Sequence, residues 1–125
     1  MESIIYKTEV YILVGACMEV YNTLGYGFLE IVYKDAMEFE FIEKQLEYCR
    51  EIELPISYKG IKLNRSFFAD FILFGNIIVE VKANADGISD ATIAQTLNYL
   101  KASGHRIGVV INFGKRKLEY KRVIF

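Results

Sequence analysis

The sequence predicts a mixed α/β fold, in which a mixed β-sheet is flanked by helices in the element order ααβββαββ. Two observations support this prediction. The first part of the chain places apolar residues at helical spacing, and the later part contains short runs rich in Ile, Val and Phe that are bounded by glycine turns. A third helical segment separates two of these runs, which allows a parallel crossover between two strands.

Composition fits one globular domain over residues 1–125. Hydrophobic residues make up 53% of the chain and charged residues 25%. No apolar run approaches the roughly 20 residues of a membrane span. The acidic start at Met1-Glu2-Ser3 lacks the basic region of a secretory signal, and the distant Cys17 and Cys49 fit reduced thiols better than a disulfide or a zinc site. We therefore expect a cytoplasmic protein with no membrane partner.

Two helices open the chain. Apolar residues at helical spacing predict the first from about Ile4 to Leu24, and the glycines of Gly25-Tyr26-Gly27 predict its end. The second is expected from about Leu29 to Leu46. Its expected buried stripe consists of Ile31, Val32, Ala36, Phe39, Ile42 and Leu46.

Strands follow from Tyr48 onward. Residues 48–58 contain the only proline, Pro55, which predicts an edge strand or a bulge. Lys59-Gly60 is typical of a turn, and residues 61–74 form a longer strand before a second turn at Gly75-Asn76. The second turn predicts a hairpin between the strand 61–74 and the strand that follows it.

The rest of the chain, from residue 77 onward, is predicted to contain one helix and three strands. The strand "IIVEVK" (77–82) precedes a third helix, which Ser89 or Asp90 could cap and which ends near Gly104. The buried strand "IGVVINF" and a short polar strand complete the chain, and they span residues 107–113 and 117–123.

Charged residues inside the apolar strand 77–82 need an explanation, because unpaired buried charges are costly. Glu80 and Lys82 share one face of this strand, and Asp70 is the only acid of the preceding strand. A two-residue loop would place Asp70 opposite Val81 and away from Glu80. Convergence of the three charged groups therefore predicts a three-residue loop or a bulge.

Two carboxylates at one point suit Mg²⁺ or Mn²⁺, which prefer oxygen ligands. A lysine beside the metal can stabilise charge that develops on a phosphate or orient the attacking water. Each residue also has an ordinary explanation: Glu-x-Lys is a common cross-strand pair, and a buried Asp can be satisfied by backbone donors. The combination of all three in apolar strands favours a site.

Together these residues resemble a known family. The pattern Asp70, nine residues, then Glu80-Val81-Lys82 is similar to the PD-(D/E)XK nuclease superfamily. "LGYGFLEIVYKDA", with Gly27, Glu30 and Tyr33, resembles its GxxExxY branch, as do "YKGIKL" and "VVINFG". Tyr21 and Tyr26 depart from that branch, where histidine and proline are frequent.

The resemblance implies a restriction-endonuclease-like fold with Asp70 and Glu80 as metal ligands and Lys82 as the catalytic lysine. It also implies that Glu30 reaches the metal or its surroundings, although a carboxylate in a first helical turn could simply stabilise its helix. Gln95 and Tyr99, spaced i, i+4, match an element that lies near the active centre in related nucleases.

Other residues admit two interpretations. Tyr33 could hydrogen-bond a site carboxylate, but a core aromatic with a satisfied hydroxyl is the more ordinary role. His105, the only histidine, is expected to be a solvated turn residue. Gln95 and Tyr99 could equally form a half-exposed helix face.

Charge is unevenly distributed along the chain. Residues 1–53 carry a net charge of −7, and residues 101–125 carry +6. The basic segment could contact nucleic-acid phosphates, or it could be a solvated strand edge protected from aggregation.

The sequence therefore favours a Mg²⁺- or Mn²⁺-dependent nuclease that acts on nucleic acid, with DNA preferred to RNA. One alternative is a nuclease-like binding or assembly module without turnover. Another is a nuclease subunit that needs a partner protein for its substrate. A homodimer would also suit so small a chain, because two sites side by side could address two strands.

Overall fold

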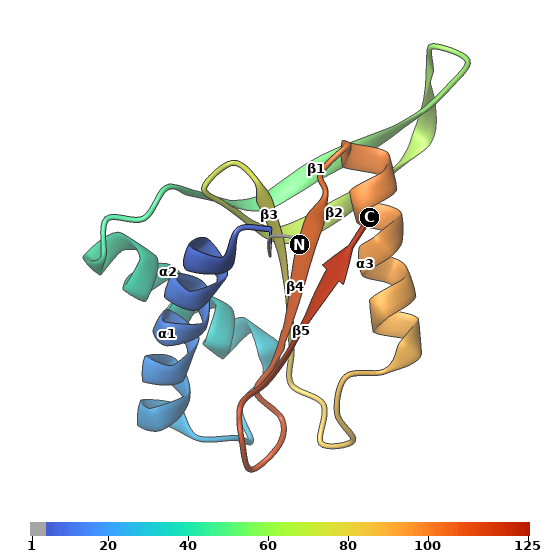
Figure 1. Cartoon of the computed structure of the whole chain (residues 1–125). Coiled ribbons are helices and arrows are strands. Elements are labelled where there is room, and N and C mark those ends of the chain that lie inside the picture. The colour runs from blue at the N-terminus through green and yellow to red at the C-terminus, as the bar shows by residue number, and fades with distance from the viewer. Residues whose placement is uncertain (1–4) are drawn as a thin grey trace, which may run out of the picture.

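A computed structural model describes residues 5–125 and shows helices on both sides of a five-stranded sheet (Figure 1). The element order is ααβββαββ, which confirms the predicted fold class. The helices are α1 (Lys7–Leu24), α2 (Glu30–Glu43) and α3 (Asp90–Ser103). The strands are β1 (Tyr48–Tyr58), β2 (Ile61–Leu73), β3 (Ile77–Lys82), β4 (Ile107–Asn112) and β5 (Glu119–Ile124).

The sheet is mixed and follows the spatial order β1-β2-β3-β4-β5. β3 and β4 are parallel, and every other neighbouring pair is antiparallel. Helix α3 forms the crossover between the parallel pair, as predicted. Helices α1 and α2 cover one face of the sheet and α3 covers the other (Figure 1). Two apolar clusters result, one on each face.

Helix α1 begins at Lys7, after Tyr6 in a left-handed conformation (φ 53°). The predicted start at Ile4 lies outside the described residues. The helix ends at Gly25, whose N–H donates to the Tyr21 carbonyl at 2.7 Å. Among residues 5–125, no helix is long and apolar enough to cross a membrane.

The predicted buried face of α2 is wrong in part: Val32, Ala36 and Leu46 are half-buried, but the other three predicted residues are exposed. Ile31, Phe39 and Ile42 are at least half exposed, at 50%, 61% and 58%. The buried positions are instead Tyr33, Lys34, Met37 and Phe41. Aromatic contacts determine which side of α2 faces the sheet, because the Tyr33 ring stacks on Phe113 and the Phe41 ring meets Phe71 edge to face.

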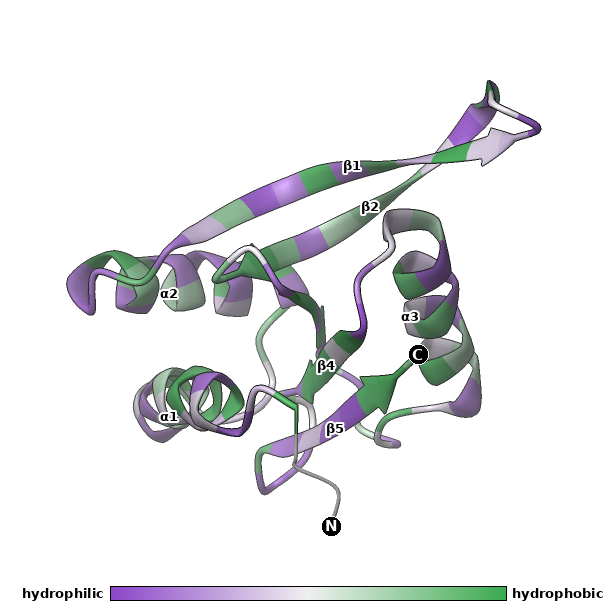
Figure 2. Ribbon diagram, turned by 45° about the horizontal axis from the view of Figure 1, so that its top comes forward, coloured by the Kyte–Doolittle hydropathy of each residue, from purple (hydrophilic) through white to green (hydrophobic). Residues whose placement is uncertain are grey.

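Strands β1 and β2 form a long hairpin whose outer part projects past α3 (Figure 2). Lys59 and Gly60 make its turn with positive φ values of 51° and 77°. Pro55 lies in an edge strand and beside a register shift, so both predicted explanations of this proline, an edge strand and a bulge, are confirmed. We call residues 55–66 the arm.

Helix α3 has the predicted ends. The Ser89 side chain accepts a hydrogen bond from the Thr92 N–H at 3.1 Å, so Ser89 is the N-cap. Gly104, in a left-handed conformation, ends the helix. β4 follows at Ile107 and is buried along its whole length, as expected of a central strand with both faces covered.

Candidate active site

The β2–β3 hairpin sets the geometry of the candidate site. Leu73 pairs with Ile77, so the loop contains three residues, Phe74, Gly75 and Asn76. Phe74 and Gly75 both have positive φ values, and the Asn76 N–H donates to the Leu73 carbonyl at 3.1 Å. Of the two predicted alternatives, a three-residue loop or a bulge, the structure has the loop. The register places Asp70 opposite Glu80.

The two carboxylates join the strands where the regular pairing ends. The last regular pair is Phe71 with Val79. Beyond it, the Asp70 N–H donates to Glu80 Oε2 at 2.9 Å, and the Val81 N–H donates to Asp70 Oδ2 at 2.7 Å. Side-chain oxygens thus replace the backbone acceptors of the sheet, and this exchange fixes both acidic groups in one place.

The β1–β2 ribbon also changes face at this point. Phe71 packs in the apolar cluster beneath α1 and α2, whereas Ala69, two residues earlier, packs in the cluster beneath α3. Strict alternation would put both on one face. Opposite Asp70, Glu51 adopts a positive φ of 56°, which is uncommon for a residue with a side chain. This change of face places Asp70 between the two layers of helices.

A lysine of helix α2 lies next to Asp70. Lys34 Nζ lies 3.0 Å from Asp70 Oδ1, and it also forms an ion pair with Glu51. The Lys34 side chain is only 11% exposed. Burial lowers the pKa of its ammonium, but the hydrogen bonds to Glu51 and Asp70 outweigh burial, so the pKa is raised. Lys34 therefore stays charged.

Sequence reasoning missed Lys34. A signal existed in the spacing of Tyr33, Met37 and Phe41, which lie four residues apart on one helical face next to Lys34. The apolar residues Phe39 and Ile42 form a competing stripe on the opposite side and concealed it.

Glu80 is the most perturbed carboxylate of the site. It is 4% exposed. Burial, and then the negative charge of Asp70, raise the pKa of Glu80 to about 8. The hydrogen bond from the Asp70 N–H and the charges of Lys82 and Lys34 oppose this rise without cancelling it. A buried carboxylate whose pKa is raised beside a second carboxylate is typical of functional sites.

Lys82, Gln95 and Tyr99 complete the surroundings on the α3 side. Lys82 follows Glu80 by two residues and shares its face of β3. Gln95 Nε2 donates to the Tyr99 hydroxyl at 2.8 Å. Burial and then the Glu80 carboxylate raise the pKa of Tyr99, with a smaller effect from Asp70. The Gln95–Tyr99 pair thus lies within electrostatic reach of the carboxylates.

Glu30 and Tyr33 take other places. Glu30 is exposed in the first turn of α2, one turn before Lys34. Tyr33 is buried, its hydroxyl donates to the Gly25 carbonyl at 2.6 Å, and it accepts from the Phe28 N–H at 3.2 Å. Tyr33 is therefore the core aromatic with a satisfied hydroxyl. It fixes the loop before α2 and does not contact a site carboxylate.

Two loops meet beside Lys82, at the carboxyl ends of β3 and β4. The buried Asn112 side chain accepts from the Asn84 N–H at 2.9 Å and donates to the Asn84 carbonyl at 3.0 Å. A side chain at Gly114 would come within 2.4 Å of the Asn84 backbone, so only glycine allows this approach. The loop end of a parallel pair is a common ligand site in α/β folds.

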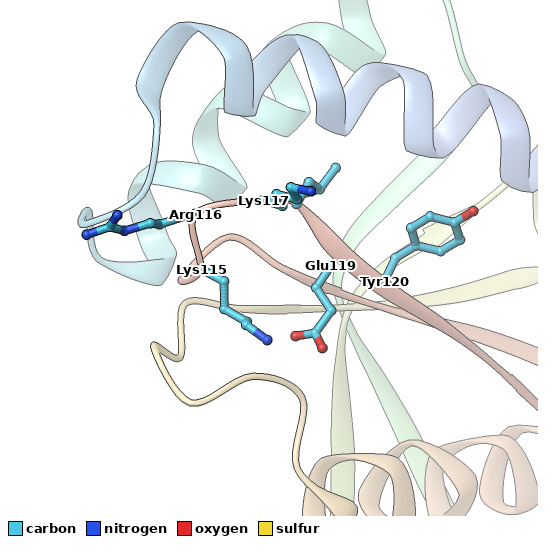
Figure 3. Close-up of a pocket in the computed structure, with 6 residues that line it drawn as sticks. Lys115, Arg116, Lys117, Glu119 and Tyr120 are labelled. Carbon is cyan, nitrogen blue, oxygen red and sulfur yellow. The ribbon is translucent and has the colours of Figure 1, made fainter.

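A hollow of about 560 Å³ lies at the β4–β5 loop and is lined by residues 115–120 (Figure 3). Lys115 and Glu119 point toward the loop that joins β3 to α3, whereas Arg116 points away (Figure 3). The Tyr21 hydroxyl donates to the Lys115 carbonyl at 2.5 Å and attaches this loop to α1. Basic side chains thus surround one end of the parallel strands.

The donor set of the site fits a hard divalent cation. Asp70 and Glu80 offer carboxylate oxygens, and Mg²⁺ retains several waters when two protein carboxylates bind it. Glu80 Oε1 makes no hydrogen bond to the described residues. Within residues 5–125, no three His, Cys, Asp or Glu side chains converge to hold a metal, so Glu30 does not join the pair. A cation would relieve the repulsion that raises the Glu80 pKa.

Comparison with protein families agrees with this geometry. A family model described as the PD-(D/E)XK nuclease superfamily matches residues 7–123. This chain belongs to that superfamily.

A solved structure has a fold similar to that of this chain. The crystal structure of SSO0001 superposes with a TM-score of 0.59 at 16% sequence identity. The match covers 95% of this chain and 59% of SSO0001, so this chain spans little more than half of that protein's length. A search of curated proteins gives no significant match. The superfamily assignment thus rests on the family model and agrees with the fold.

Proposed function

We propose that this chain is a Mg²⁺- or Mn²⁺-dependent phosphodiesterase that cleaves nucleic acid, with DNA preferred to RNA. The observation that carries the proposal is the pairing of the half-buried Asp70 with the buried Glu80 at the end of regular β2–β3 pairing, followed by Lys82 on the same face as Glu80. Hard-metal ligands and a lysine at one point suit phosphodiester hydrolysis, because a metal can activate water and a cation can stabilise the charge that develops on the phosphate.

Each residue then has a separate role. Asp70 and Glu80 would hold the cation, which when bound lowers the pKa of a water and offsets negative charge on the phosphate. Lys82 would stabilise charge that develops on the phosphate. Lys34 keeps Asp70 in place through its ion pair at 3.0 Å. Gln95 and Tyr99 would orient the bound strand from α3.

Affinity for the polymer would come from phosphate contacts. The loop residues Lys115 and Arg116 are exposed and lie at the same end of the sheet as Lys82. Binding should weaken steeply as salt concentration rises, because each phosphate contact releases a counterion.

A cleavage assay tests the proposal. The wild-type chain is incubated with Mg²⁺ or Mn²⁺ and with duplex DNA, single-stranded DNA and RNA, beside Asp70→Asn and Lys82→Ala. We expect cleavage of at least one polymer and a loss of about a hundredfold or more in each variant. Lys7→Ala, exposed on α1 and outside the basic segment 101–125, serves as the control with unchanged activity. Equal cleavage by all variants would attribute the activity to a contaminant and refute the proposal.

A second candidate function is supported by the Lys34–Asp70 ion pair. Asp70 already has a cationic partner, so the chain satisfies this carboxylate without a metal. A nuclease-like binding or assembly module without turnover would look the same. It predicts that Asp70→Asn leaves partner binding unchanged and that no polymer is cleaved with any divalent cation.

We also propose membership in the GxxExxY branch and treat residues 1–125 as one domain. The spacing of Gly27, Glu30 and Tyr33 supports the first statement. Gly27 has a φ of 110°, which favours glycine, and the Tyr33 hydroxyl holds the same loop. In this branch the motif would therefore position α2, and through α2 the site lysine Lys34.

A further inference from the structure

The arm differs in charge and exposure from the sheet that carries it. Residues 57–65 are all exposed. Between residues 54 and 69 the chain has three basic residues, Lys59, Lys62 and Arg65, and no acidic one. The first 53 residues, in contrast, carry a net charge of −7. The arm is thus a locally cationic element on a chain with almost no net charge.

Large apolar side chains accompany these cations. Tyr58 is 58% exposed and Ile61, its partner across the ribbon, is 66% exposed. Lys59 Nζ lies 5.5 Å from the centre of the Tyr58 ring, which orders the tip. Apolar and cationic groups side by side suit a surface that has sugars and base edges next to phosphates.

We infer that the arm is a docking element that inserts into the major groove of duplex DNA and aligns it with the carboxylate site. This inference rests on the proposed function. A two-stranded β-ribbon fits the major groove of B-DNA, which is about 12 Å wide. The major groove of an RNA duplex is deep and narrow, so the same ribbon would not enter it.

The position of the arm connects it to the site. Ser66, at the base of the arm, is four residues before Asp70 on β2, or roughly 13 Å along an extended strand. A hollow of about 480 Å³ opens between the arm and α3, and Lys101 contributes a further positive charge to its wall. Phe67 at this hollow packs on Tyr99 with ring centres 5.0 Å apart. A duplex on the arm would therefore pass over α3 toward Tyr99 and Glu80.

Binding measurements test the inference. Fluorescence anisotropy is recorded with a 20-base-pair DNA duplex and Mg²⁺ in a Lys82→Ala background, so that cleavage does not interfere. The arm variant carries Lys59→Ser and Lys62→Ser. The matched control carries Lys7→Ser and Lys44→Ser, two exposed lysines on α1 and at the end of α2, both outside the basic segment 101–125. We expect the arm variant to bind about tenfold or more weakly and to lower the salt slope by about 1.8.

The outcomes separate this inference from the proposed function. If the wild type cleaves DNA but the arm variant binds like the control, the inference fails and the function stands. If the arm variant loses duplex binding while the wild type cleaves no polymer, the function fails and the inference stands. Absence of any duplex binding, or tighter binding of an RNA duplex, overturns the inference.

A protein partner for the arm would be seen by sedimentation. A second copy of this chain could also cover exposed apolar residues. If the arm variant changes a dimer to a monomer and leaves DNA affinity unchanged, the arm is an interface between copies and the inference is overturned. We expect the same sedimentation for the arm variant and the control.

Discussion

The two halves of the β2–β3 hairpin follow different rules. Next to the loop, Phe71, Ile72 and Leu73 pair regularly with three residues of β3, and apolar side chains fill both faces. Beyond Phe71, the carboxylates of Asp70 and Glu80 replace backbone acceptors, and Glu80 is buried with a raised pKa. The first half is built for stability. The second concentrates charge that stability alone would not select.

The largest loss of stability should come from damage to the stable half. Phe71→Ala removes a fully buried ring and should lower the free energy of unfolding by about 3–5 kcal/mol, as measured by urea denaturation. Phe68→Ala, on the same strand but 55% exposed, should lower it by less than about 1 kcal/mol. Equal losses would mean that burial on this strand does not determine stability.

A smaller loss of stability, and one that depends on Mg²⁺, should follow when Asp70 loses its ion-pair partner Lys34. Lys34→Met should lower the free energy of unfolding without metal by about 3 kcal/mol, because it leaves two carboxylates with less compensating charge. Mg²⁺ should raise the melting temperature of this variant more than that of the wild type, since Lys34 no longer competes at Asp70 Oδ1.

Lys44→Met is the control for that comparison. Lys44 also pairs with two carboxylates, Glu19 and Glu40, but away from the site, and exposed pairs contribute little. Its loss should be below about 1 kcal/mol and insensitive to Mg²⁺. An equal response of both variants to Mg²⁺ would count against a cation site at Asp70.

The pH dependence of stability should reveal the cost of Glu80. The folded-state pKa is raised from 4.5 to about 8, so the folded chain binds a proton more tightly than the unfolded chain does. This contribution to stability is present below pH 4.5 and is lost as pH rises through about 8. Glu80→Gln keeps an acceptor for the Asp70 N–H and lacks this loss.

Thermal unfolding of Glu80→Gln and the wild type should therefore diverge between pH 5 and pH 9. The variant should be more stable at pH 9 by on the order of 5 kcal/mol, with a much smaller difference at pH 5. A constant difference across this range would show that Glu80 does not titrate between the two values.

The smallest effect should come from Glu30. This carboxylate is exposed at the first turn of α2 and stands apart from the Asp70–Glu80 pair. Glu30→Gln should lower the free energy of unfolding by about 0.5 kcal/mol through the helix dipole and leave the cleavage rate within about twofold of wild type. A large loss of activity without a loss of stability would assign Glu30 to the site after all.

Much of the fold could be predicted because local signals and global topology agree. The turn at Lys59-Gly60, the cap at Ser89 and the apolar runs of β3 and β4 each determine an element on their own. The chemistry of Asp70 and Glu80 predicts a three-residue loop or a bulge, because either one brings the two carboxylates together, and the structure has the loop.

The buried face of α2 and the role of Lys34 could not be predicted from local signals in the sequence. Phe39 and Ile42 are as apolar as Met37 and Phe41, so the sequence contains two candidate faces, and only packing against Phe71 and Phe113 selects between them. The change of face at Asp70 also breaks the alternation on which strand reasoning depends. Both features arise from tertiary contacts.

Calorimetric titration of Mn²⁺ tests the central claim most directly, because it needs no knowledge of the substrate. The wild type and Asp70→Asn are titrated under identical conditions, with circular dichroism to verify that both are folded. The account predicts saturable binding to the wild type, and its loss in Asp70→Asn. Equal binding by both chains, or no binding by the folded wild type, would contradict a metal site at the Asp70–Glu80 pair.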